Sequence, residues 1–139
     1  MRFWDSSALV GLLVGETSTT TLRRLLDANP DQTVWCLSTV EIGSALARRV
    51  REGFETPSED RFRTDWKELS EHWREISAVE HVRARALRLL NVHPLRSGDA
   101  LQLGAALIAC EDRPQALPFV CLDDRLRDAA RREGFPVLP

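Results

Sequence analysis

The stretch from Arg2 to Leu13, which reads RFWDSSALVGLL, changes its hydrophobic periodicity at a single acid, Asp5. The three residues before Asp5 are too few for a helix and are typical of a short buried strand. The apolar residues after it recur at the spacing of one helix face: Ala8, Leu9, Leu12 and Leu13. Because ligands of open α/β sheets bind at the carboxyl ends of the strands, we expect Asp5 to lie at the mouth of a site.

The length and composition indicate one soluble globular domain. The chain has 139 residues, so we expect residues 1–139 to form a single domain with its own core. Hydrophobic residues make up 43% and charged residues 29%, and no apolar run approaches the roughly 20 residues of a membrane helix. The start, MRFWDSS, lacks the long apolar stretch of a secretory signal, so we expect a cytoplasmic protein.

The net charge and the cysteines exclude some classes of protein. A formal charge of −2 argues against a protein that coats nucleic acid by bulk electrostatics, although a local basic rim remains open. Cys36, Cys110 and Cys121 are odd in number and widely separated, without a CxxC spacing. They indicate reduced thiols packed in a core, not disulfides or a zinc site.

Strand-like and helix-like segments alternate along the whole chain. Strands are expected at residues 2–4, 33–37, 73–77, 119–122 and 136–138, and helices after Asp5 and at residues 16–28, 38–50, 56–72, 79–90, 100–109 and 126–134. The helix at 79–90 should turn Val82, Ala86, Leu87 and Leu90 inward. This alternation predicts a three-layer α/β/α sandwich with a short central parallel sheet of four to five strands.

Three aspartates stand just before predicted helices, namely Asp5, Asp99 and Asp123. Each of them alone is explained as well by helix N-capping, since Asp is a preferred N-cap residue. Glu41 stands three residues after Ser38, which is the spacing of a capping box, so a purely structural role at the helix start also explains Glu41. Its side chain nonetheless points back toward the start of its helix, and therefore toward the ends of the strands.

Four carboxylates at one edge of a sheet predict a cation site. Such acids repel one another unless a cation neutralises them or protons are retained. Oxygen ligands without His or Cys are suited to Mg²⁺, with Mn²⁺ as the alternative. A metal held in this way lowers the pKa of a bound water and offsets the charge of a phosphodiester, which is the chemistry of a nuclease.

Four segments together resemble the motif blocks of PIN-domain ribonucleases, and most of all the VapC-type toxins of bacterial toxin–antitoxin pairs. They are DSSALV at residues 5–10, STVEIGSALA at 38–47, SGDALQLGAALIA at 97–109 and LDDRLRDAARREGF at 122–135. The likeness covers nearly the whole chain, with the blocks in the right order and at the right intervals, so it is more specific than any single motif.

The resemblance implies a role for each acid. Asp5, Glu41, Asp99 and Asp123 match the family's acidic quartet, with Asp5 and Asp99 at its usual Mg²⁺ positions and Asp123 as a third expected ligand. Glu41 would position the attacking water or support it indirectly. Ser7 matches the small hydroxyl residue that orients the site. Where the family often has Thr or Ser two residues before the fourth acid, this chain has Cys121, which leaves the orientation of Asp123 open.

The resemblance also implies partners. It predicts an RNA substrate, a homodimer, and a small antitoxin whose C-terminal segment covers the site, either as a partner or within a hetero-oligomer. Arg96 and Arg125 lie beside the acids in sequence and are candidates for RNA phosphates, although surface side chains or local ion pairs explain them equally well. Three aromatic residues are candidates for the antitoxin contact or for ordinary core packing: Phe62, Trp66 and Trp73.

Alternative functions fit the sequence less well. A response-regulator receiver needs a Lys late in the chain, but the only lysine is Lys67. A haloacid-type phosphatase needs an Asp two residues after the first one, where this chain has Ser7. A catalytically weak PIN-fold module that only binds RNA or a partner remains the main alternative, although such a module gains little from a cluster of repelling acids.

Overall fold

The computed structural model describes residues 1–15 and 17–139. Glu16, where the sequence pattern places the start of the second helix, lies outside the described residues. Within the described residues, no helix combines the length and the apolar character that crossing a membrane requires.

The centre of the fold is a five-stranded sheet in the order β3-β2-β1-β4-β5, and every pair of neighbouring strands is parallel. The strands are β1 (Arg2–Trp4), β2 (Gln32–Trp35), β3 (Trp73–Ile76), β4 (Phe119–Val120) and β5 (Val137–Leu138). All five lie close to the predicted positions, but β2 and β4 end two residues earlier than predicted.

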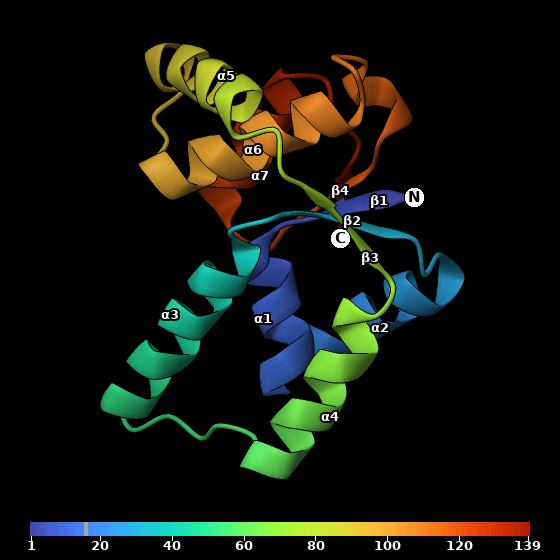
Figure 1. Cartoon of the computed structure of the whole chain (residues 1–139), viewed down its shortest axis with the longest axis vertical. Helices are drawn as coiled ribbons and strands as arrows, with labels where there is room; N and C mark the ends of the chain where they lie inside the picture. Colours follow the sequence, from blue (N-terminus) through green and yellow to red (C-terminus); the bar gives the residue numbers. More distant parts are fainter. Residues whose placement is uncertain (16) are drawn as a thin grey trace.

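Helices cover both faces of the sheet, as Figure 1 shows, and confirm the predicted three-layer sandwich. One face carries α1 (Ser6–Val14), α2 (Thr19–Ala28), α3 (Ser38–Arg51) and α4 (Glu59–Ser70). The other carries α5 (Val79–Val92), α6 (Ser97–Ala109) and α7 (Asp124–Arg132), with a short 3-10 turn at Pro114–Ala116.

The alternation of side chains along the strands divides the core into two halves. Three strand residues point into the half under α5, α6 and α7: Phe3, Trp35 and Phe119. Their chain neighbours point into the half under α1 and α3: Trp4, Val34 and Val120. Because successive strand residues face opposite sides, a strand of two to four residues is enough to supply both halves.

The central helix of the second layer is α6, which has more buried residues than any other described helix, as its apolar sequence predicts. A Cβ at Gly104 would lie only 3.0 Å from the carbonyl oxygen of Val82, so the glycine lets α5 pack closely on α6. This packing uses Val82, Ala86 and Leu89. The predicted inward orientation of Leu87 and Leu90 is therefore wrong: their exposures are 59% and 39%.

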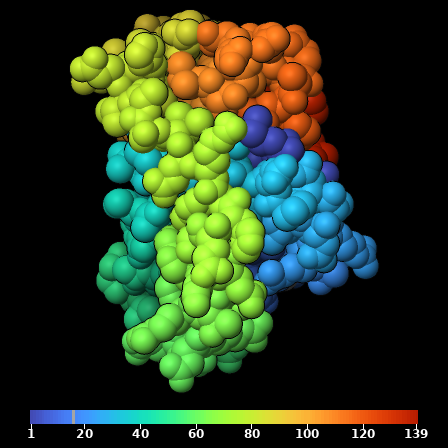
Figure 2. Space-filling model, turned by 45° about the vertical axis from the view of Figure 1, so that its right-hand side comes forward, coloured from blue at the N-terminus to red at the C-terminus, as the bar shows by residue number. Residues whose placement is uncertain are grey.

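The helix α4 lies on the surface of the first layer, as its few apolar residues predict. Figure 2 shows it as the green surface of the lower half, between α3 and α2. The rings of Phe62 and Trp66 on α4 stack with their centroids 5.9 Å apart. The ring of Trp66 also meets that of Trp73 on β3 edge-on, with a centroid distance of 5.3 Å. These half-buried rings pack against the core, which supports the core-packing interpretation of all three.

The strand order creates a switch point between β1 and β4. From β1 the chain moves to β2 on one side, and it later returns to β4 on the other side. The crevice at such a point, outside the carboxyl ends of the strands, is where open α/β sheets bind ligands. Asp5 follows β1 directly, whereas Cys121 and Leu122 separate Asp123 from the end of β4.

Candidate active site

A cavity of about 690 Å³ opens at this edge of the sheet. Three of the four predicted acids line it, although they come from three different elements: Glu41, Asp99 and Asp123. The fourth, Asp5, is only 2% exposed, and its hydrogen-bond partner Ser7 lines the cavity. The fold therefore gathers the predicted quartet around one cavity.

Asp5 is both the N-cap of α1 and a buried acid of the site. Its Oδ2 accepts hydrogen bonds from the backbone N–H of Ser7 at 3.0 Å and from the Ser7 hydroxyl. Burial raises the pKa of Asp5 to about 6, the hydrogen bonds from Ser7 oppose this rise, and the charge of Glu41 adds to it. Among the described residues, no positive charge contributes to the pKa of Asp5, so its carboxylate lacks a compensating cation there.

The side chains of Ser7 and Cys121 fix the position of Asp5. Ser7 Oγ, besides donating to Asp5, accepts a hydrogen bond of 2.9 Å from the backbone N–H of Leu122. The Cys121 thiol donates to Asp5 Oδ2 at 3.4 Å, and burial raises the pKa of this thiol, which therefore stays protonated. Ser7 and Cys121 hold Asp5 between β1 and the segment after β4.

The residue at position 121 does not orient the Asp123 side chain. Asp123 is the N-cap of α7, and its Oδ1 accepts a hydrogen bond of 2.9 Å from the backbone N–H of Leu126. Of the atoms of Asp123, the Cys121 thiol contacts the backbone carbonyl oxygen, at 3.6 Å, and not the carboxylate. The start of its own helix therefore orients Asp123.

Glu41 lies in the first turn of α3 and faces the cavity, as predicted. The predicted capping box with Ser38 is wrong, because the N-cap of α3 is Leu37 and Ser38 is already the first helical residue. Instead, the side-chain amide of Gln102 donates to Ser38 Oγ at 3.0 Å and to Glu41 Oε2 at 2.7 Å. A residue of α6 thus supplies the hydrogen bond that the local pattern assigned to α3.

Asp99 lies in the first turn of α6, where its Oδ2 accepts a hydrogen bond of 3.2 Å from the backbone N–H of Arg96. Burial raises the pKa of Asp99, the Arg96 hydrogen bond opposes this, and the charge of Asp123 adds to the rise. The charges of Arg96 and Arg125 act in the opposite direction. Both predicted arginines therefore lie within electrostatic range of Asp99.

The donor set of the cavity suits a hard cation. Among the residues that the structure describes, no three His, Cys, Asp or Glu side chains are close enough to hold one ion. Mg²⁺, however, is commonly held by only one or two carboxylates and completes its octahedron with water and phosphate. Asp99 and Asp123, which line the cavity and repel each other, fit this requirement. That Asp5 binds the same metal ion together with Asp99 and Asp123 stays a prediction.

The cavity has a basic end that the sequence analysis missed. Its wall along α3 includes residues at the spacing of one helix face, namely Glu41, Ser44, Ala45 and Arg48, together with their neighbours Val40 and Arg49. Arg48 is exposed and forms no ion pair within the described part of the chain. The spacing from Glu41 to Arg48, two helical turns, was the signal that could have found it.

Two further titratable residues, Asp124 and His93, have local structural roles. Asp124 is an exposed first residue of α7 and pairs with Arg127 at 3.6 Å, as expected for an acid at a helix start. His93 is buried, with its Nε2 2.7 Å from Glu133 Oε1. Neither residue lines the cavity.

Comparison with known proteins finds two curated relatives, both from Mycobacterium tuberculosis. Ribonuclease VapC45 (strain CDC 1551 / Oshkosh) and Ribonuclease VapC49 (strain ATCC 25618 / H37Rv) are each 31% identical to this chain over 139 residues. The match covers 99% of this chain and 94% of each relative. No family model matches the chain.

A solved structure shows the same fold. It is described as a toxin-antitoxin complex from Klebsiella pneumoniae, and its matching chain superposes with a TM-score of 0.66 at 15% sequence identity. The superposition covers 100% of this chain and 97% of the other.

Proposed function

Since the chain belongs to the VapC family of ribonucleases, we propose that it is a Mg²⁺-dependent endoribonuclease and the toxin of a toxin–antitoxin pair. The observation that carries this proposal is the cavity at the switch point of the sheet, with Glu41, Asp99 and Asp123 on its wall and Asp5 beneath it. The charge of Glu41 raises the pKa of Asp5, and the charge of Asp123 raises the pKa of Asp99, as expected where a cation is to bind between like-charged groups.

In this proposal Asp5, Asp99 and Asp123 hold the metal, with Mn²⁺ as a possible substitute for Mg²⁺. A bound cation would lower the pKa of water and offset the charge of the phosphodiester. Glu41, held through Oε2 by Gln102, orients the water that attacks phosphorus. Ser7 and Cys121 act through Asp5, whose carboxylate they fix by hydrogen bonds.

The RNA backbone would run from the acids toward the basic end of the cavity. Arg48 lies two turns of α3 from Glu41, about 10 Å along the helix axis, and is placed to meet a phosphate beside the scissile one. Arg96 and Arg125, which act on Asp99, are the candidates on the other side. Val10 and Val40 supply apolar wall against which a ribose or base can pack.

The partners are also part of the proposal. A homodimer would have to cover exposed apolar side chains, and the described residues offer two sets: Leu37, Val40, Val50 and Phe54 on or beside α3, and Val79, Leu87, Leu90 and Val92 on α5. An antitoxin segment that covers the cavity would contact the α3 set first, because Val40 belongs both to this set and to the cavity wall. We infer that the antitoxin covers the acidic cavity and that a second copy of the chain binds away from it.

RNA cleavage with and without EDTA tests the proposed reaction. Asp5→Asn and Asp99→Asn should each reduce cleavage of single-stranded RNA by at least about a hundredfold, because each removes a charge from the metal site. Asp124→Asn is the matched control: it changes an exposed acid at the start of α7 and should retain full activity.

Cleavage that persists in EDTA, or in both aspartate variants, would contradict the mechanism. Calorimetric titration with Mg²⁺ or Mn²⁺ separates the enzyme from the binding-module alternative. The enzyme should give a heat of binding that Asp99→Asn weakens, whereas a module without the metal site gives none.

A further inference from the structure

Gln102 joins α6 to the first turn of α3. It lies one turn after Asp99 on α6, is 1% exposed, and places its amide nitrogen 2.7 Å from Glu41 Oε2 and 3.0 Å from Ser38 Oγ. The two N–H bonds of one amide are therefore divided between two acceptors on another helix. Gln102 is thus a residue of α6, the helix that carries Asp99, whose side chain binds Glu41.

The orientation of this amide follows from the charge of Glu41. A carboxylate only accepts hydrogen bonds, so the amide must turn its NH₂ group toward Glu41 and its oxygen away. Gln102 Oε1 is left buried without a hydrogen-bond partner among the described residues. A buried acceptor without a partner destabilises the folded state, and the two hydrogen bonds that the amide donates to Ser38 and Glu41 offset this cost. The amide is therefore oriented to donate to Glu41 at the expense of its own oxygen.

The second oxygen of Glu41 also lies against α6. A Cβ built on Gly98 would lie 3.4 Å from Glu41 Oε1, so α6 beside Asp99 passes close to this oxygen while Gln102 binds the other. The same helix therefore flanks both oxygens of the carboxylate. Its rotation is restricted, and its position is tied to that of Asp99.

We propose that Gln102 is a positioning residue that holds the Glu41 carboxylate in the orientation in which it acts on the attacking water. The activity part of this inference rests on the proposed ribonuclease function. Residues that orient a ligand or a base in this way typically change activity by 10- to 100-fold when they are replaced. Gln102 acts on turnover and not on RNA binding, because it is buried behind Glu41.

The first test replaces Gln102 by methionine, which retains the volume and removes both N–H donors. The kcat should fall by at least about tenfold, and KM should change by less than about twofold. Gln32→Met is the matched control. Gln32 is also a buried glutamine, 3% exposed, whose Oε1 has no partner among the described residues, but it lies at the amino end of β2.

Unchanged kcat in Gln102→Met, or an equal loss in Gln32→Met, would overturn the proposal. The coupling to Glu41 is tested by the double variant. If Gln102 acts only through Glu41, Gln102→Met should cause no further loss of kcat in a Glu41→Ala background. A full tenfold loss in that background would show that Gln102 acts elsewhere and would also overturn the proposal.

A third measurement does not depend on activity. In ¹H–¹⁵N spectra the side-chain amide protons of Gln102 should exchange slowly and be well separated, and Glu41→Ala should shift one of them strongly. Unchanged amide signals in Glu41→Ala would overturn the contact. If the wild-type protein cleaves no RNA but shows this shift, the proposed function fails while the positioning contact stands.

Discussion

Two groups of acids in this molecule have opposite surroundings. At the carboxyl edge of the sheet, Asp5 and Asp99 receive hydrogen bonds from neutral donors, a hydroxyl, a thiol and backbone N–H groups. Burial is the largest cause of the raised pKa of both, and a neighbouring carboxylate adds to it in each case. In the part of the chain that the structure describes, no cation donates a hydrogen bond to Asp5, and the charges of Arg96 and Arg125 do not cancel the raised pKa of Asp99.

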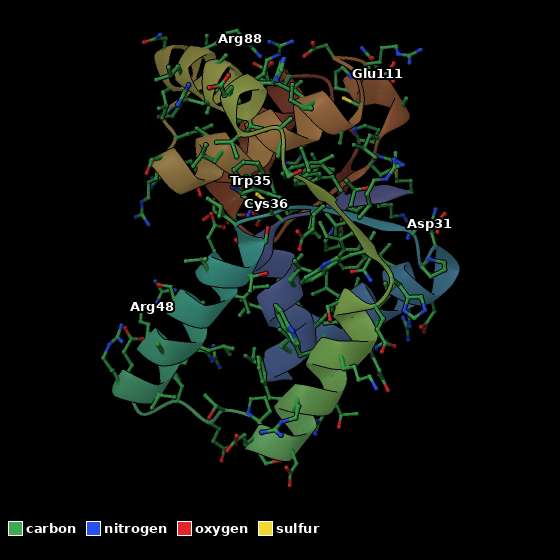
Figure 3. All side chains as sticks on the ribbon, viewed as in Figure 1. Asp31, Trp35, Cys36, Arg48, Arg88 and Glu111 are labelled. Atoms are coloured by element: carbon green, nitrogen blue, oxygen red, sulfur yellow. The ribbon has the colours of Figure 1, made fainter. Side chains whose placement is uncertain are left out.

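In the layer of α5, α6 and α7, acids meet cations. Asp112 accepts both hydrogen bonds of Arg85, which lower its pKa. Burial works against ionisation of Glu133, but the hydrogen bonds from Arg88 and His93 outweigh it and lower its pKa. Figure 3 shows Arg88 on α5, on the other side of the sheet from Arg48 on α3.

The difference separates acids that serve the fold from acids that serve a ligand. Where the protein supplies the positive charge, ionisation stabilises the native state. Where it supplies only neutral donors, ionisation costs stability until a cation from outside arrives. Substitutions in the two groups should therefore change stability in opposite directions.

The largest effect on stability is expected for Asp5→Asn. The amide oxygen of Asn can accept the same hydrogen bonds from Ser7, while the buried charge is lost. A pKa raised from 3.8 to about 6 corresponds to about 3 kcal/mol. In EDTA at pH 7 the variant should therefore be more stable than the wild type by up to about this amount, as measured by urea unfolding.

The pH dependence of unfolding tests whether the charge of Asp5 destabilises the folded state. Because the native state binds the Asp5 proton more tightly than the unfolded state, the free energy of unfolding of the wild type falls as the pH rises from about 4 to about 6. The advantage of Asp5→Asn should be near zero below pH 4 and largest above pH 6. Excess Mg²⁺ should narrow it. An advantage that is the same at all pH values would show that Asp5 is not a destabilising charge.

Glu133→Gln should have a smaller effect in the opposite direction. It removes the charge that Arg88 and His93 contact, and we expect a loss of about 1–2 kcal/mol, or about 3–8 °C in melting temperature, because Arg88 is half exposed. RNA cleavage should stay within about twofold of the wild type. Glu111→Gln, which alters an exposed pair with Arg113, is the control and should leave stability unchanged. If Glu133→Gln is as stable as the wild type, the distinction between the acids at the cavity and the acids paired with cations does not hold.

Arg48→Ala should have the smallest effect on stability, within about 0.5 kcal/mol, since Arg48 is an exposed residue. It should instead weaken RNA binding and reduce the salt dependence of binding by about one phosphate contact. Binding is best measured in the Asp99→Asn background, where turnover is low. Arg51→Ala, in the last turn of the same helix but outside the cavity wall, is the control. Equal effects of both variants would argue against a specific phosphate contact.

Local sequence patterns predicted the fold well because each element carries its own periodicity. The switch of pattern at Asp5, the β-branched segment before Cys36 and the apolar run of α6 are all local features, and the structure confirms them. The errors occurred where a neighbouring element decides. Leu87 and Leu90 have the right spacing for an inner face, but the close approach at Gly104 selects the face of α5 that carries Leu89.

The sequence by itself determined which chemistry this chain carries: acids at the ends of strands and starts of helices, without a lysine or histidine partner beside them. Only the tertiary structure decided how those acids are held. The donors to Asp5 and Glu41 include Cys121 and Gln102, which lie 116 and 61 residues away from them along the chain. Contacts at such separations depend on how helices pack on the sheet, and no local pattern encodes them.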